Sequence, residues 1–487
     1  MLLSIWMMWG WVMLGVAEQF GFYLGDNIYC LEVEQEGLGG YQFLEHRVDD
    51  TFVFAVTSPY PSRFHELDRD LSVLNISQHP LGYRLSKAFT TSRGTILFIG
   101  YQDGMIWRYS SVNMGWANTG WRFNWLGSWS IDEHNGVIMA AEYTADTAEY
   151  ARVIRSFDDG MSWNVVFMKN ARASSSPEIR HFHTLMCDPY TGNWYLSSGD
   201  GWRECKVWLS KDDGDTWVDV TDYDLDPSLP PNVRTLCLHR LTAFWFTPEY
   251  ICWATDDRIN VTGARLVISP RSEPLDIRVV GRVSYNEVRS VIEFPGKGWL
   301  LITENKSGYV GIELVFISKD FEIIPLGILY GITDNFTASV ASRRAYWDEK
   351  KECWVAYSLA RLVEPPIVRY KLFRNFRVNA QVNSEHGGYV EVEPEKICGY
   401  KKGDRLTLRA VEYPGYVFTG WSGDYVSASK ILKIEVDRDI SVMAHFYPEG
   451  AEPEYKVNVM SPSLLLELSI IMVCVSVFYL CYSGCRN

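Results

Sequence analysis

Residues 210–217 read SKDDGDTW and residues 156–163 read SFDDGMSW, two copies of the pattern S-x-D-x-G-x-[ST]-W. Ser156 and Ser210, their first residues, are 54 positions apart. In such a stretch Ser and Asp bond to nearby backbone, Gly accepts a positive φ, and Trp packs beneath the turn. A turn motif that returns at this interval predicts repeated units of about four strands each.

Short apolar runs around these turns recur in pairs. The first members begin near residues 51, 95, 136, 193, 250, 298 and 353, and the second near residues 71, 104, 151, 205, 264, 313 and 366. Runs rich in β-branched and aromatic residues, bounded by Gly, Pro, Asp or Asn, are typical of strands. Many evenly spaced short strands predict an all-β fold, here a β-propeller with seven or else six blades.

A third set of segments precedes these pairs and is expected to form the innermost strands. The segments are Lys87-Ala-Phe, Trp129-Ser-Ile, His183-Thr-Leu, Arg234-Thr-Leu, Arg289-Ser-Val and Arg344-Ala-Tyr. Residues 20–33 have no such partner, so we expect them to close the ring by pairing with the last blade. A disulfide between Cys30 and Cys353 would then be within reach, although sequence alone does not fix cysteine pairing.

The two full motifs resemble the Asp-box, or BNR repeat, of the sialidase-like propellers. Shorter forms occur as SVNMG at 111–115 and SKDFE at 318–322. The resemblance covers about residues 18–373 and places each box on the hairpin between the third and fourth strands of a blade. It implies a structural role for the box, away from the active face.

Residues 374–447 change character and resemble the bacterial repeat module related to the divergent internalin B-repeat. The matching features are Gly388-Tyr-Val, Tyr400 with Gly403, Leu406-Thr-Leu, Gly415-Tyr-Val-Phe, Gly420-Trp-Ser-Gly and Val442-Met-Ala-His-Phe. The resemblance implies a small β domain that serves as a spacer in surface proteins. The alternative is a ligand-binding module whose contact would be Trp421.

The two ends of the chain are apolar. Residues 1–17 predict a signal peptide, with an uncleaved anchor as the alternative. Residues 464–482, after a turn-rich linker at 448–463, predict a single transmembrane helix, with a buried C-terminal helix as the alternative. Residues 483–487 would then be cytoplasmic, and the bulk of the chain would be an extracellular domain at the cell membrane.

The formal net charge is −14 and the sequence pI is about 5.2. No run of Lys and Arg is present that would overcome this acidity, so nucleic acid is excluded as a partner.

In an up-and-down propeller the starts of the inner strands meet on one face with the ends of the second strands. The ligand-binding candidates at that face are Trp129, Arg180, His181, His183, Arg234, Arg289 and Arg344. Arginine binds carboxylates and sulfates through two parallel hydrogen bonds, so these residues predict an anionic ligand. The alternative is that the charged residues form salt bridges that seal the channel.

The resemblance to sialidases implies an arginine cluster, a Tyr–Glu nucleophile pair and an acidic Asp. Glu142 and Tyr143 would supply the pair and Asp200 the acid. This chain departs from the family because the Arg-Ile-Pro motif near the first blade is absent, which weakens the assignment of these catalytic residues.

His181 and His183 alternate along one strand and therefore share a face. With Asp200 they could hold a divalent metal, but the set lacks a further ligand in the sequence. We expect a hydrogen-bonding histidine pair, with no metal and no other cofactor.

The expected function is recognition of extracellular carbohydrate or of a partner surface, with an acidic glycan or a surface protein as the partner. The first alternative is a sialidase-like glycoside hydrolase or a uronate lyase acting on acidic glycans. The second is a structural envelope protein without a small ligand. Fold alone does not separate these three classes.

Overall fold

The computed structural model describes residues 18–36, 41–46, 53–57, 63–68, 70–78, 85–100, 104–110, 115–124, 128–201, 204–222, 238–255, 263–304, 311–330, 344–359 and 367–457. The chain divides into two compact units, the first ending at Phe373 and the second beginning at Arg374. Residues Gly25–Cys30 group with the second unit.

Within its described residues, the first unit is built mainly from short strands. In chain order they are β1 (Glu18–Leu24), β2 (Asn27–Glu36), β3 (Tyr41–His46), β4 (Val53–Thr57), β5 (Arg63–Leu67), β6 (Val73–Gln78), β7 (Leu85–Thr90), β8 (Thr95–Gly100), β9 (Met105–Ser110), β10 (Gly115–Arg122), β11 (Ser128–His134), β12 (Val137–Glu142), β13 (Tyr150–Ser156), β14 (Asn164–Asn170), β15 (His181–Cys187), β16 (Trp194–Gly199), β17 (Val207–Ser210), β18 (Val218–Asp219), β19 (Leu241–Phe246), β20 (Tyr250–Thr255), β21 (Ala264–Pro270), β22 (Arg278–Ser284), β23 (Glu287–Phe294), β24 (Gly298–Glu304), β25 (Gly311–Ser318), β26 (Ile323–Tyr330), β27 (Tyr346–Asp348), β28 (Cys353–Leu359) and β29 (Ile367–Asn375).

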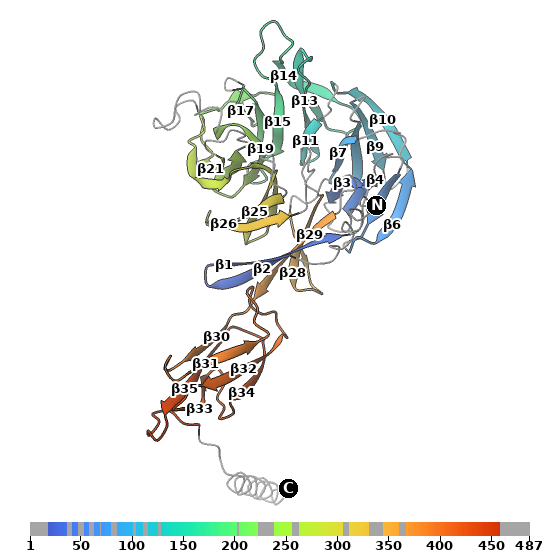
Figure 1. The fold of residues 1–487 in the computed structure, drawn as a ribbon. Helices are drawn as coiled ribbons and strands as arrows, with labels where there is room; N and C mark the ends of the chain where they lie inside the picture. The colour runs from blue at the N-terminus through green and yellow to red at the C-terminus, as the bar shows by residue number, and fades with distance from the viewer. Residues whose placement is uncertain are drawn as a thin grey trace, which may run out of the picture. The chain divides into compact units, whose positions relative to one another are not determined.

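These strands form small sheets that follow one another around a common centre, as in a β-propeller (Figure 1). Six sheets take four consecutive strands each, from β3–β6 through β23–β26. The inner strands β3, β7, β11, β15, β19 and β23 each contact the next, β28 contacts β3, and β1 contacts β26. The second strands β8, β12 and β16 are buried at every position. The core therefore lies between successive sheets.

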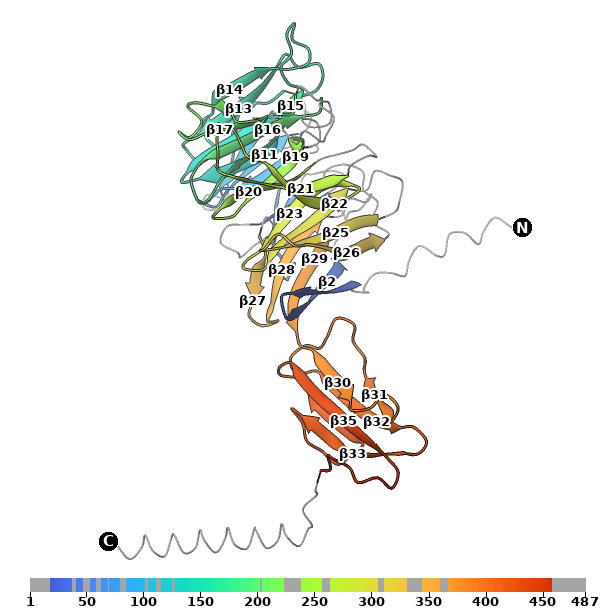
Figure 2. The ribbon, with the colours of Figure 1, turned by 90° about the vertical axis from the view of Figure 1, so that its left-hand side faces the viewer.

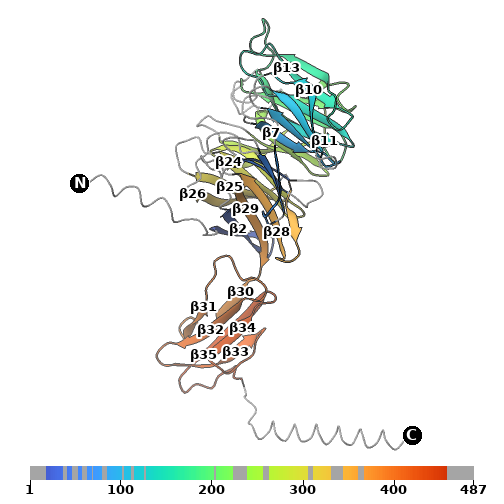
Figure 3. The ribbon, with the colours of Figure 1, turned by 90° about the vertical axis from the view of Figure 1, so that its right-hand side faces the viewer.

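The remaining sheet joins the two ends of this unit, in the order β1-β2-β29-β28-β27 (Figure 3). The expected pairing of the N-terminal segment with the last blade is thus confirmed. The Cys30–Cys353 disulfide is wrong: both residues are thiols. They lie on β2 and β28, which β29 separates, and two strand spacings of about 4.8 Å exceed the reach of a disulfide.

The first members of the strand pairs are confirmed as β4, β8, β12, β16, β20, β24 and β28. The second members are confirmed except in the first sheet, where the third strand is Arg63–Leu67 and the predicted run at residue 71 leads into the fourth strand, β6. Arg63–Leu67 reads RFHEL, and its polar residues hid it from a search for apolar runs. The predicted inner strand at Arg234 lies outside the described residues; the inner strand of that sheet is β19.

The two sequence motifs form the same turn between the third and fourth strands of their sheets. In the first, the backbone N–H of Gly160 donates to Ser156 Oγ at 2.9 Å, and the backbone N–H of Ser162 donates to Asp158 Oδ1 at 2.8 Å. The indole N–H of Trp163 donates to the Gly160 carbonyl at 3.1 Å. The second motif repeats these three bonds at 2.8, 2.8 and 3.1 Å.

The second unit is a small β domain of two three-stranded sheets. Its strands are β30 (Val378–Val382), β31 (Gly388–Glu393), β32 (Arg405–Glu412), β33 (Tyr416–Gly423), β34 (Ile431–Glu435) and β35 (Ile440–Pro448). The sheets have the orders β30-β35-β33 and β31-β32-β34 (Figure 2). Trp421 is fully buried in the core between them and donates its indole N–H to the Ser429 carbonyl at 2.9 Å. A role for Trp421 as a surface ligand contact is therefore wrong.

The predicted signal peptide at 1–17 and the predicted transmembrane helix at 464–482 lie outside the described residues. Within the part of the chain that the structure does describe, no helix has the length and apolar character needed to cross a bilayer.

Candidate functional site

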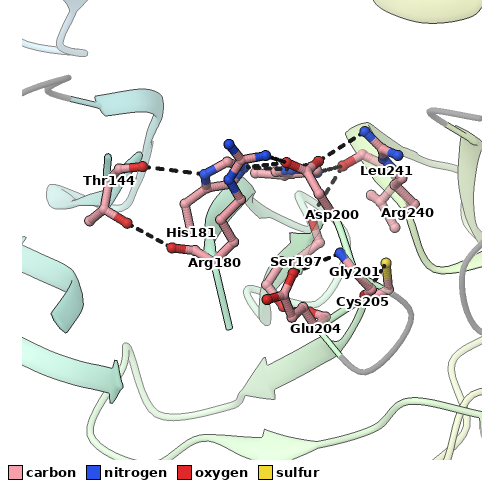
Figure 4. Close-up of polar contacts among 12 residues, drawn as sticks. Thr144, Arg180, His181, Ser197, Asp200, Gly201, Glu204, Cys205, Arg240 and Leu241 are labelled. Atoms are coloured by element: carbon pink, nitrogen blue, oxygen red, sulfur yellow. Dashed lines mark hydrogen bonds and ion pairs between the residues drawn. The ribbon is translucent and has the colours of Figure 1, made fainter. Parts of the chain in front are cut away.

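A cluster of charged and aromatic side chains gathers where β15 begins, between β12 and β19 (Figure 4). The register of β11, β15, β19 and β23 is irregular near the start of each strand. These irregular segments contain Trp129, His183, Thr242 and Arg289 respectively. Bulges bend a strand and redirect its side chains, and they are common near functional sites.

Asp200, which follows β16, lies at the centre of the cluster. Arg180 Nη1 donates to its Oδ2 at 2.5 Å, and Arg240 Nη2 donates to its Oδ1 at 2.9 Å. His181 Nε2 lies 3.3 Å from Oδ2 and His183 Nε2 lies 3.4 Å from Oδ1. The Asp200 side chain is 16% exposed, so one carboxylate contacts four cationic or polar groups with little access to water.

Both histidine rings are buried, and a backbone carbonyl contacts the nitrogen of each ring that does not face Asp200. His181 Nδ1 lies 3.3 Å from the Thr144 carbonyl, and His183 Nδ1 lies 3.1 Å from the Leu241 carbonyl. A carbon added at Gly199 as Cβ would lie 2.5 Å from Cε1 of His183, so this strand needs glycine beside the ring. The ring of Tyr143 stacks on that of His181, with centroids 3.9 Å apart.

Burial and contacts shift the pKa values of these groups. Burial lowers the pKa of His181 to about 4, against the opposing influence of Asp200. Burial alone would raise the pKa of Asp200, but its contacts with His181 and His183 outweigh burial and hold that pKa well below the usual carboxyl range. Asp200 is therefore ionised at neutral pH.

An outer ring of ion pairs supports this centre. Arg180 also binds Asp146 through two bonds of 2.7 and 3.1 Å. Arg172 Nη2 lies 3.3 Å from Glu204 Oε2, which accepts the backbone N–H of Gly201 at 2.7 Å. The guanidinium of Arg180 is thus held by two carboxylates of the protein itself.

Glu142 and Tyr143 are neighbours in sequence but face different surroundings. The Glu142 carboxylate is fully buried and binds Arg152 through Nη2 at 2.8 Å and Nε at 2.9 Å. It also accepts the backbone N–H groups of Asn124 and Arg152. Tyr143 instead stacks on His181. Sequence adjacency therefore does not make these two side chains one reactive pair.

Of the other candidates, the structure describes the side chain of Arg344 alone. Arg344 is an exposed residue whose Nε lies 3.4 Å from Oε2 of Glu293, near the last residue of β23, whereas His181 is the first residue of β15. Trp129 and Arg289 are placed by their backbones alone, and Arg234 lies outside the described residues. Arg240 belongs to the cluster and was missed, because Arg234-Thr-Leu matched the repeated pattern more closely than Arg240-Leu-Thr.

Comparison with known proteins adds a family for one part of the chain. Residues 378–450 match the family described as the divergent InlB B-repeat domain. No curated protein sequence matches the chain.

Among solved structures, a streptogramin B lyase is similar with a TM-score of 0.44 and 11% identity, over 73% of this chain and 97% of that one. Virginiamycin B lyase from Staphylococcus aureus has a TM-score of 0.45 and 10% identity, over 70% and 99%. YCF48 from Cyanidioschyzon merolae has a TM-score of 0.45 and 10% identity, over 70% and 98%.

The protein thus combines a β-propeller with a C-terminal segment, residues 378–450, that matches the divergent InlB B-repeat domain family.

Proposed function

We propose that the first unit is a seven-bladed propeller of the Asp-box type, and that it recognises extracellular carbohydrate or a partner surface without cleaving it. The blade count rests on the seven sheets formed by the described residues, with the ends of the unit meeting in one of them. The Asp-box assignment rests on the hydrogen bonds that the two motifs share.

The observation that carries a binding role is the state of the candidate acid, Asp200. A glycosidase acid must hold a proton near neutral pH, so its pKa is raised. Arg180 and Arg240 instead bind the two oxygens of Asp200, which favours its ionised form. Glu142 is likewise neutralised by Arg152. These contacts support recognition over hydrolysis.

We propose further that the protein is displayed at the cell membrane, with a signal peptide at 1–17 and an anchor at 464–482. The support is the apolar sequence of both segments and the turn-rich linker before the second. In this arrangement the repeat domain comes between the propeller and the anchor in the chain. Its partner would be an acidic glycan or a surface protein.

The test is binding of the full-length chain, purified in a mild detergent, to an array of acidic and neutral glycans. We expect retention on acidic glycans, and we expect Arg289→Ala, at the irregular start of β23, to weaken it at least about tenfold. Arg278→Ala is the matched control, because that exposed arginine lies on the outer strand β22 beside Asp276. An array without any retained glycan would reject carbohydrate recognition and favour the structural envelope role.

A further inference from the structure

The hydrogen-bond partners of His181 and His183 fix which ring nitrogen carries the proton. Both Nδ1 atoms face backbone carbonyls, those of Thr144 and Leu241, at 3.3 and 3.1 Å. A carbonyl oxygen only accepts, so each Nδ1 carries an N–H. In a neutral ring, Nε2 then carries no proton and has a free lone pair. An unprotonated ring nitrogen of this kind is the atom that binds metals.

Those two Nε2 atoms point at each other and at one carboxylate. They lie 3.2 Å apart, and they lie 3.3 and 3.4 Å from the two oxygens of Asp200. Three acceptors at contact distance repel one another unless a cation lies among them. The cation is either one additional proton on a ring or a metal ion.

We propose that His181, His183 and Asp200 bind one zinc-class divalent ion through the two Nε2 atoms and a carboxylate oxygen. Tetrahedral bonds of about 2.0–2.1 Å place neighbouring ligand atoms about 3.3 Å apart. The two nitrogens here lie 3.2 Å apart, and they lie 3.3 and 3.4 Å from different oxygens of the Asp200 carboxylate. One atom from each residue already falls within 4.8 Å of the others, so a small rotation of the carboxylate completes the set.

The surroundings are those of a metal site. Metal-binding histidines usually donate their other ring N–H to a carbonyl or carboxylate, which fixes the tautomer. Thr144 and Leu241 supply those carbonyls here. Arg180 and Arg240 hold the carboxylate from its other lone pairs, as ligating carboxylates are held. Two nitrogens and one oxygen suit zinc, with copper, nickel and cobalt as competitors.

The charges around the site indicate which fourth ligand the bound metal ion would take. The positive charges of Arg180 and Arg240 are matched by Asp200 and Asp146. A divalent ion therefore adds uncompensated positive charge, and three protein ligands leave one position open. We expect hydroxide or a small carboxylate there.

This metal site replaces the expectation of a simple hydrogen-bonded histidine pair, and it goes beyond the recognition function. A glycan could bind the propeller with no metal present, and a metal could bind without any glycan. Failure of either proposal leaves the other standing.

The experiment uses the full-length chain after removal of metals by a chelator. Zn²⁺ is titrated against a chromophoric competitor, and Co²⁺ is titrated with its visible spectrum recorded. We expect one ion per chain, a tetrahedral Co²⁺ spectrum, and at least about tenfold weaker Zn²⁺ binding in His183→Gln and in Asp200→Asn. His134→Gln and Asp276→Asn are the controls, because each removes a similar group outside the site, Asp276 being an exposed residue beside Arg278. Both should bind as the parent does.

X-ray absorption of the zinc-loaded parent chain gives a readout that does not depend on how the variants fold. It should show two imidazole ligands and Zn–N distances of about 2.0–2.1 Å. The proposal is overturned if the parent chain takes up no stoichiometric ion, if both ligand variants bind Zn²⁺ as tightly as the controls, or if absorption shows fewer than two imidazoles. The cation among the three acceptors would then be a proton.

Discussion

The burial of single charged residues decides what they can do in this protein. Glu142 looked reactive in sequence because Tyr143 follows it, yet its carboxylate is fully buried and neutralised by Arg152. Breaking a buried ion pair leaves an uncompensated charge, which is far more costly than losing an exposed pair. Such a residue contributes to folding, and its loss should be seen in stability.

Arg152→Met should therefore lower the free energy of unfolding by about 3–5 kcal/mol, because the Glu142 carboxylate keeps its burial and loses its cation. Urea denaturation followed by tryptophan fluorescence measures this. Arg405→Met is the control, since the ion pair of Arg405 with Glu435 is largely exposed and its loss should not be measurable. Equal effects of the two changes would contradict the account of Glu142.

His239 is a second residue whose burial has a measurable consequence. Its side chain is fully buried, neither ring nitrogen has a hydrogen-bond partner among the residues that the structure describes, and burial lowers its pKa from 6.5 to about 4. Below pH 6.5 the unfolded chain takes up a proton at His239 that the folded chain excludes. His239 therefore lowers the free energy of unfolding as the pH falls from 6.5 towards 4, and it has no such effect above pH 6.5.

The free energy of unfolding of the parent chain should fall between pH 7 and pH 4, and His239→Met should make this fall smaller by up to about 3 kcal/mol. Each unit of pKa shift corresponds to about 1.36 kcal/mol. Urea titrations across that pH range would show a flatter profile than in the parent chain. His134→Gln, on β11, serves as the control. A variant profile parallel to that of the parent would mean that His239 is protonated in the folded state.

At the scale of elements, the same turn occurs in more places than the sequence motif indicates. Asp159, Asp213 and Phe321, each at the fourth position of a motif, have φ values of 60, 52 and 64°. Leu71 has a φ of 68°, and Asp68 accepts the backbone N–H groups of Asp70 and Ser72 as Ser156 does in the full motif.

The turn at Asp68 was missed because it lacks the Ser and Trp that mark the motif. A carboxylate accepts backbone N–H groups as well as a hydroxyl does, so the backbone geometry tolerates the change. The inner-strand bulges were missed for a related reason: apolar periodicity reports which residues are buried and carries no signal for an added residue. The strands themselves were largely predicted.

The packing of the Asp-box turn is testable at Gly160. This residue has a φ of +79°, and an added Cβ would lie 2.6 Å from Cδ2 of Leu97 in the preceding sheet. Gly160→Ala should cost about 2–4 kcal/mol, from backbone strain together with overpacking. Gly120→Ala, at a φ of +75° with nothing near its Cβ, should cost only about 1 kcal/mol. Thermal unfolding compares them, and equal costs would show that contact with Leu97 is unimportant.

At the scale of the whole molecule, the propeller depends on the sheet that joins its ends. β2 pairs with β29 in this sheet, and Lys371 Nζ on β29 lies 2.6 Å from Glu34 Oε1 on β2. The sequence predicted this closure because residues 20–33 had no other partner. It also placed Arg180, His181, His183 and Asp200 together on one face of the propeller. It missed Arg240, which contacts Asp200 from a separate segment that only folding brings near.

Leu31→Ala tests the closure, because Leu31 on β2 is fully buried. The variant should lose about 2–5 kcal/mol of unfolding free energy and expose the edge of β29. Val280→Ala, on the outer strand β22 and 40% exposed, should change little. Chemical denaturation and light scattering measure both effects, and a stable, monodisperse Leu31→Ala chain would contradict a role for β2 in closing the ring.

The measurement that bears most directly on the proposed function is mass spectrometry of acidic glycans incubated with the full-length chain. If the propeller recognises glycans without cleaving them, the glycans should be retained at their original masses, in the parent chain and in Asp200→Asn alike. Shortened glycans from the parent chain, absent with Asp200→Asn, would show a hydrolase or lyase and contradict the account.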